Sequence, residues 1–221
     1  VIPSLSFFVL SLVSVEQHHS YPISVEQIIR SAEEKTASQA KKAVKKAKAA
    51  EPKRKPGRPI GSKNKPKAEI VLNPELQRIQ SMLKALLLLI RPALQPVYLA
   101  LDGHFGNYPS FFMVRQCGLH LISKLRYDAA LCFSFSGEYK GSGPHPKYGE
   151  RVDYRHISDT YLKSTTVEKG IQTCIYQAQL LYPDFPDPLN VVILVKTNLT
   201  TGAWAHVILF SSDQSLSADQ M

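Results

Sequence analysis

The chain is poor in cysteine, with Cys117, Cys132 and Cys174 as its three examples in 221 residues. Their odd number and wide spacing provide neither a paired disulfide framework nor a CxxC motif, and no His pair lies near them at ligand spacing. We therefore expect neither a structural disulfide nor a zinc site. A reducing, cytoplasmic environment fits this cysteine usage best.

Long hydrophobic runs are also missing. The apolar stretch from Leu5 to Val13 is too short and too interrupted to span a membrane, and no basic region precedes it as in a secretory signal peptide. We therefore expect a buried strand there and no membrane partner. Because the sequence starts at Val1 and ends at Met221 where a helix is being approached, we expect a fragment truncated at both ends.

Positive charge is concentrated in one segment. The formal net charge is +9, yet Lys41 to Lys67 alone carries twelve Lys or Arg and a single acid, Glu51, so the remainder is slightly acidic. A compact run of cations is typical of a protein that binds a polyanion, since each neutralised phosphate releases condensed counterions. The alternative is a solvated helix face or a flexible linker, which is the commoner role of charge runs.

Within this segment, Lys55-Pro56-Gly57-Arg58-Pro59 is similar to an AT-hook. In that motif an extended backbone lies in a narrow A·T-rich minor groove, whose negative potential attracts the arginine. Further lysines downstream are expected to contact phosphates, which position the protein without specifying sequence. A basic linker without groove binding is the alternative. The predicted DNA-binding residues here are Lys53, Arg54, Lys55, Gly57, Arg58, Pro59, Lys63 and Lys65.

The first half of the chain alternates strand and helix signals. Residues 6–16 have the composition of a strand, and Ser24 with Gln27 has the form of a capping box, which predicts a helix running to about Ala50 with a solvent-exposed second half. Asn73-Pro74 predicts the start of another helix, whose apolar residues form one stripe up to Ile90.

A strand–helix–strand unit follows. Val97–Leu101 is nearly all apolar, which predicts a strand buried on both faces, and a short helix over 110–117 leads to a second strand over 119–125. Such a βαβ unit makes its two strands parallel. Beyond Tyr127 we expect an antiparallel insertion that is separate from this sheet, with strands over 129–136, 171–180, 191–197 and 203–210.

Asp102 is the first candidate for chemistry. It directly follows the apolar strand, and catalytic carboxylates gather at the carboxyl ends of such strands. The alternative is that Asp102 caps its own turn, and His104 and Asn107 in the same loop either support a metal-bound carboxylate or face solvent. Lys124 and Arg126, at the end of the next strand, are expected at the same edge, where they either hold a DNA phosphate or are solvated.

The segments Tyr98–Asn107, Leu119–Arg126 and Thr166–Thr173, with Lys53–Lys67 and Val207–Asp213, resemble DDE-superfamily transposases of bacterial insertion sequences, notably cyanobacterial ones. The resemblance implies an α/β fold, with an RNase H-like core and a β-rich insertion. It also implies three acids that bind two Mg²⁺ or Mn²⁺ ions for phosphodiester cleavage and strand transfer.

On this resemblance Asp102 matches the second acid, both as catalytic residue and as metal ligand, and the other two acids have no match. We expect a partial catalytic core over 1–126 with the basic insert 41–67, the insertion over 127–212, and the start of a C-terminal helical region over 213–221. Because one carboxylate cannot hold two Mg²⁺ ions, we expect catalysis and metal binding by this chain to be lost.

The resulting hypothesis is a transposase fragment that retains DNA binding, with A·T-rich element ends as its partner, a nucleoid location and the dimeric state common in the family. One alternative is a non-enzymatic protein that binds A·T-rich DNA through the basic segment. Another is an unrelated α/β nuclease or hydrolase, which would need a complete acid cluster. The other acids after Asp102 lie in apparent loops, such as Asp128, Glu138, Asp153 and Asp187.

Overall fold

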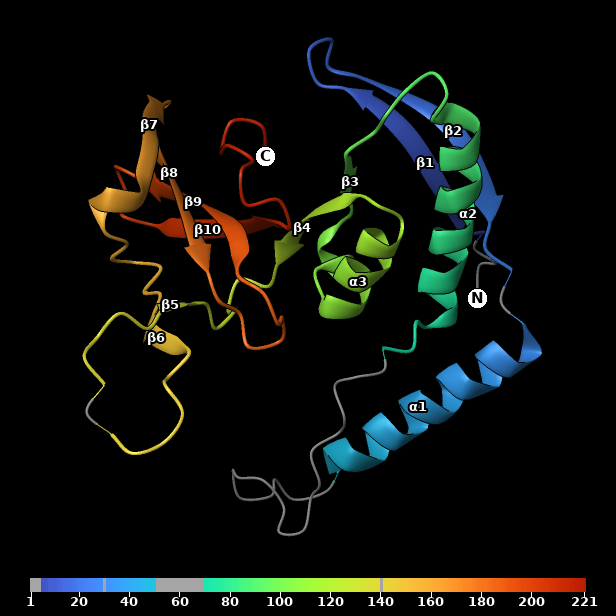
Figure 1. The fold of residues 1–221 in the computed structure, drawn as a ribbon, viewed down its shortest axis with the longest axis horizontal. Coiled ribbons are helices and arrows are strands. Elements are labelled where there is room, and N and C mark those ends of the chain that lie inside the picture. The colour runs from blue at the N-terminus through green and yellow to red at the C-terminus, as the bar shows by residue number, and fades with distance from the viewer. Residues whose placement is uncertain (1–4, 30, 51–69, 140) are drawn as a thin grey trace. The chain divides into compact units, whose positions relative to one another are not determined.

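The computed structural model describes residues 5–29, 31–50, 70–139 and 141–221 (Figure 1). The chain divides into two compact units, Val1–Glu69 and Ile70–Met221. The AT-hook-like motif and its flanking cations lie outside the described residues, so DNA binding by that segment stays a prediction. None of the helices in the described ranges is both long enough and apolar enough to cross a membrane.

The first unit contains an antiparallel hairpin. Strand β1 (Phe7–Ser14) pairs with β2 (His19–Gln27) through a turn in which His18 has a φ of 52°. The predicted strand over 6–16 is confirmed, but the predicted burial is wrong, because the side chains of β1 are alternately exposed and half-buried.

The helix predicted to start at Ser24 is wrong, since that residue lies within β2. Here Ile23 and Val25 favour an extended strand, and β1 offers a neighbouring ladder to pair with. The capping box occurs seven residues later: Glu34 N donates to Ser31 Oγ (3.2 Å) while Ser31 N donates to Glu34 Oε2 (3.0 Å). Helix α1 (Ala32–Ala50) follows, and its described side chains are exposed apart from the half-buried Glu34.

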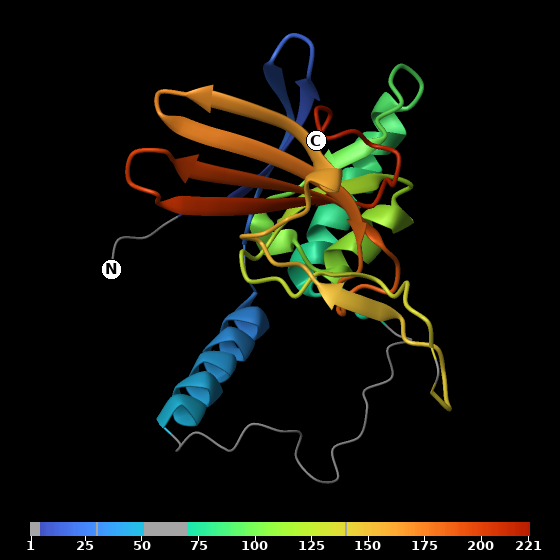
Figure 2. The same ribbon diagram turned by 90° about the vertical axis from the view of Figure 1, so that its left-hand side faces the viewer.

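The second unit is built around a six-stranded mixed sheet with the order β3-β4-β10-β9-β8-β7. Only β3 and β4 are parallel, and the other neighbours are antiparallel. The four long strands run side by side in orange and red in Figure 2. The strands are β3 (Tyr98–Ala100), β4 (His120–Leu125), β7 (Leu162–Glu168), β8 (Ile171–Leu180), β9 (Leu189–Asn198) and β10 (Trp204–Ser211).

Two helices pack against this sheet near β3 and β4. Helix α2 (Pro74–Ile90) starts as predicted, with the Asn73 side chain accepting from Leu76 N (2.8 Å), and its apolar stripe is buried. Helix α3 (Tyr108–Gln116) crosses from β3 to β4, and the parallel βαβ unit is confirmed. Two 3₁₀ turns, η1 (Gly103–Phe105) and η2 (Asp159–Tyr161), and a small sheet of β5 (Cys132–Ser134) and β6 (Tyr148–Arg151) complete the unit.

The expected separation of the β-rich strands from the βαβ sheet is wrong. Strand β10 pairs with β4 from Ile208↔Leu125 to Ser211↔Ile122, so one hydrogen-bonded sheet joins both parts. The reason is burial: Phe210 is 0% exposed and continues the apolar surface of β4. The boundary expected at residue 126 therefore does not coincide with a break in the sheet.

The strand over 97–101 is also less buried than predicted. Tyr98 and Ala100 are exposed and Leu99 is half-buried, because β3 is an edge strand of the described sheet. The core lies further along, where Phe185 makes edge contacts with Phe111 (5.4 Å) and Phe210 (5.5 Å) between ring centroids. Each such buried aromatic contributes about 1.5–3 kcal/mol over an exposed one.

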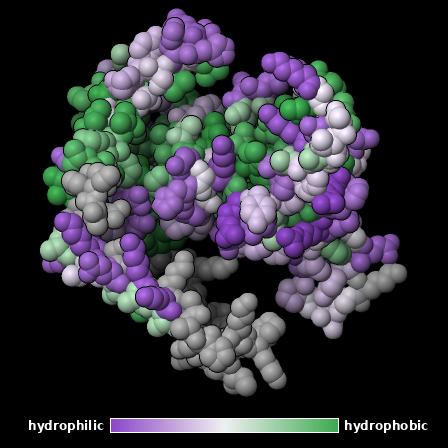
Figure 3. All heavy atoms as spheres, turned by 180° about the vertical axis from the view of Figure 1, so that it is seen from behind, coloured by the Kyte–Doolittle hydropathy of each residue, from purple (hydrophilic) through white to green (hydrophobic). Residues whose placement is uncertain are grey.

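Apolar residues also reach the surface, as the green areas of Figure 3 show. In the first unit, Val13 and Val25 of the hairpin are 66% and 62% exposed. In the second unit, Leu88 and Leu89 of α2 are 79% and 77% exposed. Clusters of this kind mark surfaces that proteins use for association.

Candidate active site at the end of β3

Asp102 follows β3 with Leu101 between them, at the carboxyl edge of the parallel strand pair, and is exposed. Its side chain accepts a hydrogen bond from His104 N (2.8 Å), so it caps the short 3₁₀ turn η1. Both interpretations from the sequence therefore describe its position: the carboxylate is at the sheet edge, and one of its oxygens caps its own loop. The second carboxylate oxygen is left with free acceptor capacity.

The backbone of Asp102 is held by β4. Ser123, 3% exposed, donates its hydroxyl to the carbonyl oxygen of Asp102 (2.8 Å), and Leu101 N donates to Ile122 O (2.9 Å). These two bonds fix the height of Asp102 above the sheet. Sequence reasoning did not single out Ser123, because β4 also contains the polar residues His120 and Lys124 and no local pattern distinguishes the serine from them.

Gly106 lets the loop after Asp102 close against β4. A Cβ atom at this position would lie 1.9 Å from Lys124 O, which no side chain can tolerate. Gly103 is less restricted, since its Cβ would lie 3.3 Å from Lys124 Cβ. Close backbone approach, rather than unusual φ, is therefore why glycine is needed at Gly106, whose φ is −72°.

Of the polar side chains near Asp102, Asn107 is hydrogen-bonded within the loop, whereas His104 lies at the surface. Asn107 caps α3, accepting from Ser110 N (3.1 Å), and its amide donates to His104 O (3.1 Å). These bonds make Asn107 part of the loop framework. His104 remains at the surface, with Nε2 3.7 Å from Glu75 Oε2 at the start of α2. Glu75 was missed in the sequence because it lies 27 positions before Asp102.

The two predicted cations at the end of β4 differ. Lys124 is exposed, and its Cβ lies close to Gly103 of the Asp102 loop, as expected. Arg126 instead forms a two-point ion pair with Asp128, with distances of 3.0 Å from both Nε and Nη2. Lys124 is thus the better placed of the two to meet a phosphate.

Arg126 also lines a cavity of about 380 Å³ beside the loop, together with Asn107, Tyr108, Tyr182 and Asp184. Partial burial raises the pKa of the Tyr182 phenol, with a further rise from the nearby Asp184 carboxylate. The Tyr182 hydroxyl interacts with Asp184, which lines the same cavity. Sequence reasoning did not single out Tyr182, which lies in a loop far along the chain.

The described residues do not by themselves fit a two-metal centre. Within the described ranges no three His, Cys, Asp or Glu side chains come together at a spacing that could hold a metal ion. Asp102 already uses one oxygen for the His104 amide, and Glu75 is paired with the His104 ring. Mg²⁺ is held in proteins by carboxylates and substrate phosphates in near-octahedral geometry, which one carboxylate cannot supply.

An α/β protein with an exposed carboxylate at the carboxyl edge of a parallel strand pair belongs to the class that places its chemistry at such an edge. The family described as DDE superfamily endonuclease matches residues 2–178, well over half of the chain. The chain belongs to this family. No curated protein and no solved structure gives a significant match.

The match confirms the predicted family and, with the mixed six-stranded sheet, the predicted α/β fold of a partial RNase H-like type. Endonucleases of this superfamily act on DNA and generally use divalent metal ions. The matched range includes the Asp102 loop, Lys124, Arg126 and the basic segment. The individual roles assigned to these residues stay predictions.

Proposed function

We propose that this chain is a DNA-binding part of a DDE transposase, in which Asp102 is one of the metal-binding carboxylates. The family match over residues 2–178 carries this proposal, because it spans Asp102 and the strand that holds it. The geometry supports it, since Asp102 is exposed at the sheet edge with Lys124 beside its loop.

In this proposal the basic segment Lys41–Lys67 provides most of the DNA affinity. Its twelve cations would neutralise phosphates, and the AT-hook-like motif would favour A·T-rich element ends. Association with the nucleoid and dimer formation on two element ends complete this hypothesis. Lys124 would add a phosphate contact close to Asp102.

We further propose that the chain on its own binds DNA without cutting it. Catalysis by this superfamily depends on divalent metal ions, and among the described residues Asp102 has no converging carboxylates to share them. The chemical step would then require carboxylates from outside this set. Asp102 would contribute one metal-binding carboxylate, held in place at the sheet edge.

Two measurements on the purified chain test this function. Fluorescence anisotropy with labelled duplex DNA should show affinity that falls steeply with salt, by about a thousandfold between 50 and 200 mM if six or more phosphates are contacted. Incubation of supercoiled plasmid with Mg²⁺ or Mn²⁺ should yield no nicked product. Robust nicking that disappears in Asp102→Ala would overturn the inactive assignment.

Matched charge removal tests the DNA contact. Replacing Lys53, Arg54 and Lys55 with Ala should lower affinity strongly and reduce the salt slope. Replacing the exposed Lys163 of β7, Lys196 of β9 and Lys169 of the turn between β7 and β8 removes the same charge and should have little effect. Equal losses in both variants would show that the DNA contact is misplaced. Affinity that tracks A·T content alone, with no preference for element ends, would favour the non-enzymatic DNA-binding alternative.

A further inference from the structure

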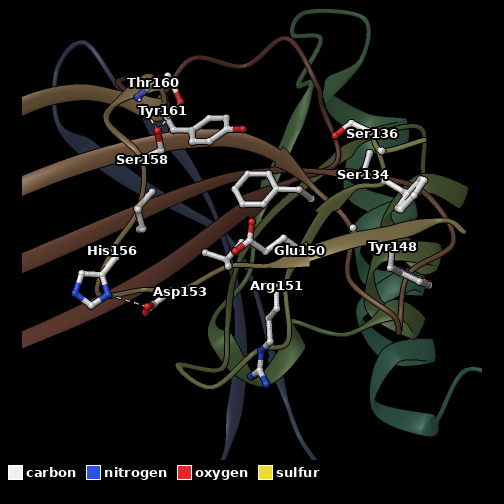
Figure 4. Close-up of a pocket in the computed structure, with 16 residues that line it drawn as sticks. Ser134, Ser136, Tyr148, Glu150, Arg151, Asp153, His156, Ser158, Thr160 and Tyr161 are labelled. Carbon is white, nitrogen blue, oxygen red and sulfur yellow. Dashed lines mark hydrogen bonds and ion pairs between the residues drawn. The ribbon is translucent and has the colours of Figure 1, made fainter. Parts of the chain in front are cut away.

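A second cavity lies away from Asp102, between the small β5–β6 sheet and the segment leading through η2 (Figure 4). Its volume is about 710 Å³. Its wall mixes aromatic rings with hydroxyl and charged groups, which is the composition of a site for a flat, polar-edged ligand. The rings belong to Phe133, Phe135, Tyr148 and Tyr161.

The aromatic wall is held in place by packing. Phe133 and Tyr161 stack with centroids 5.1 Å apart and an interplanar angle of 24°. Strand β6 approaches β5 closely, because a Cβ on Gly149 would lie 2.9 Å from Ser134 O. Tyr161 covers one face of the half-buried Phe133, and Lys147 Nζ lies over the ring of the 39% exposed Tyr148, 5.8 Å from its centroid, so a ligand would use the opposite face of either ring. A ring face can stack on any planar base, because every base has a π face.

Glu150 supplies a carboxylate in this setting. In Figure 4 it lies between Tyr148 and the Asp153–His156 pair, whereas Arg151 is directed away from it. Glu150 is exposed, and in the described part of the chain no hydrogen bond or ion pair engages it. Asp153 differs, since it accepts from His156 Nδ1 (2.8 Å) and Arg155 N (2.9 Å). Glu150 is thus the acceptor left available at this wall.

We infer that this cavity binds a guanine base of an unpaired DNA strand, stacked on its aromatic wall with the Watson–Crick edge on Glu150. An ionised carboxylate accepts only, so its two oxygens favour a base with two adjacent donors. Guanine presents N1–H beside its N2 amino group. Adenine and cytosine place a ring-nitrogen acceptor next to their amino group, and thymine places carbonyl oxygens on both sides of N3–H, so each would bring a lone pair against Glu150.

Arg151 extends the site to the backbone of the strand. It is exposed, lines the same cavity and points outward, where a phosphate of the bound nucleotide would lie. A base must leave its duplex partner to expose this edge, and the free-energy cost of doing so is least in a strand that is already single. The inference rests on the proposed function in one respect, that DNA is the ligand.

The first experiment titrates the full chain with dGMP and follows its NMR spectrum. Binding should shift resonances of the cavity residues, and Glu150→Gln should weaken it by about tenfold, since an amide offers one acceptor and brings its own donors. Glu168→Gln, which removes an exposed carboxylate from the end of β7, should bind dGMP as the unaltered chain does. Because Glu150 is exposed, folding should survive, and circular dichroism checks this.

The second experiment compares short single-stranded thymidine oligonucleotides with one central dG, deoxyinosine or dA, by fluorescence anisotropy. The dG strand should bind about 5- to 100-fold more tightly than the others. The deoxyinosine strand should bind more weakly because its base lacks the N2 amino group. A 7-deazaguanine strand keeps the Watson–Crick edge and should match dG. If dGMP binds as tightly as the dG strand, the ligand is a free guanine nucleotide and the DNA-strand part is wrong.

Two results overturn the site itself: no preference for guanine in the unaltered chain, or a preference that persists in Glu150→Gln. Neither bears on the salt-dependent duplex binding that tests the proposed function. Conversely, a chain that binds no duplex DNA would contradict that function while dGMP still reports on the cavity.

Discussion

Asp102 and Glu150 are both exposed carboxylates of the second unit, yet they are held very differently. Asp102 is tied by its own side chain to His104 N and by its carbonyl to Ser123, and Gly106 seals its loop on β4. Glu150 has no such partner among the described residues. A carboxylate held in this way suits a centre where metal geometry must be exact, whereas a carboxylate without partners suits reversible contact with the edge of a ligand.

The largest loss of stability should come from replacing the glycine that lets the Asp102 loop approach β4. Gly106→Ala places a Cβ where Lys124 O lies and should lower the free energy of unfolding by about 3 kcal/mol, because backbone must move. Gly103→Ala meets only a side-chain carbon at 3.3 Å and should cost far less. Urea unfolding of both variants measures the difference. Equal losses would show that the loop is not closed on β4 as described.

A smaller loss should follow from removing the tether on the Asp102 carbonyl. Ser123→Ala deletes a buried hydroxyl donor and should cost about 1 kcal/mol, since Phe105 N still donates to the same oxygen (3.0 Å). Ser136→Ala, at an exposed position, is the matched control and should stay within about 0.5 kcal/mol. Chemical denaturation again provides the values, and no loss at Ser123 would mean that Asp102 is positioned by the 3₁₀ turn alone.

A third carboxylate, Asp213, should make the stability of the chain depend on pH. Hydrogen bonds from Ser215 and then from the Tyr98 hydroxyl (2.7 Å) lower its pKa to about 2. Since the folded pKa is depressed, its stabilising contribution is present above the unfolded value of about 4 and is lost as pH falls towards 2. Thermal melts of the unaltered chain and Asp213→Asn should therefore converge over that window. A constant gap between the two would contradict the assignment.

The smallest effect is expected at Glu150. Glu150→Gln removes no described contact and should change the free energy of unfolding by less than about 0.5 kcal/mol. Asp102→Ala, in contrast, loses its cap on His104 N and should cost about 1 kcal/mol. Denaturation of both variants under identical conditions tests this. A loss at Glu150 as large as at Asp102 would remove the distinction between the two carboxylates.

The sequence predicted what depends on neighbouring residues. Asp102-Gly103 after an apolar run placed the carboxylate at the end of β3, and Asn73-Pro74 placed the start of α2, because caps and strand ends are local signals. At Ser24 the local signal misled. A valid capping pattern lost to the pairing of β2 with β1, whose energy comes from another strand.

Contacts between segments far apart in the sequence could not be predicted from local patterns. The pairing of Ile208 with Leu125 brings together residues far apart in the chain, and no local pattern in either strand specifies the other. The aromatic cavity likewise combines β5, β6 and η2, each of which is a short element with weak periodicity. Strand β7 was missed because its exposed, Thr-rich sequence has no apolar alternation.

The ladder between β4 and β10 also has a mechanical meaning. Strand β4 pairs with β3, which precedes Asp102, on one side and with β10 on the other, and Leu121 N donates to Ser212 Oγ (3.0 Å). Separating β10 from β4 would therefore require breaking the hydrogen bonds of this ladder. Because β4 also pairs with β3, a displacement of β10 would pass through β4 to the edge of the sheet where Asp102 lies.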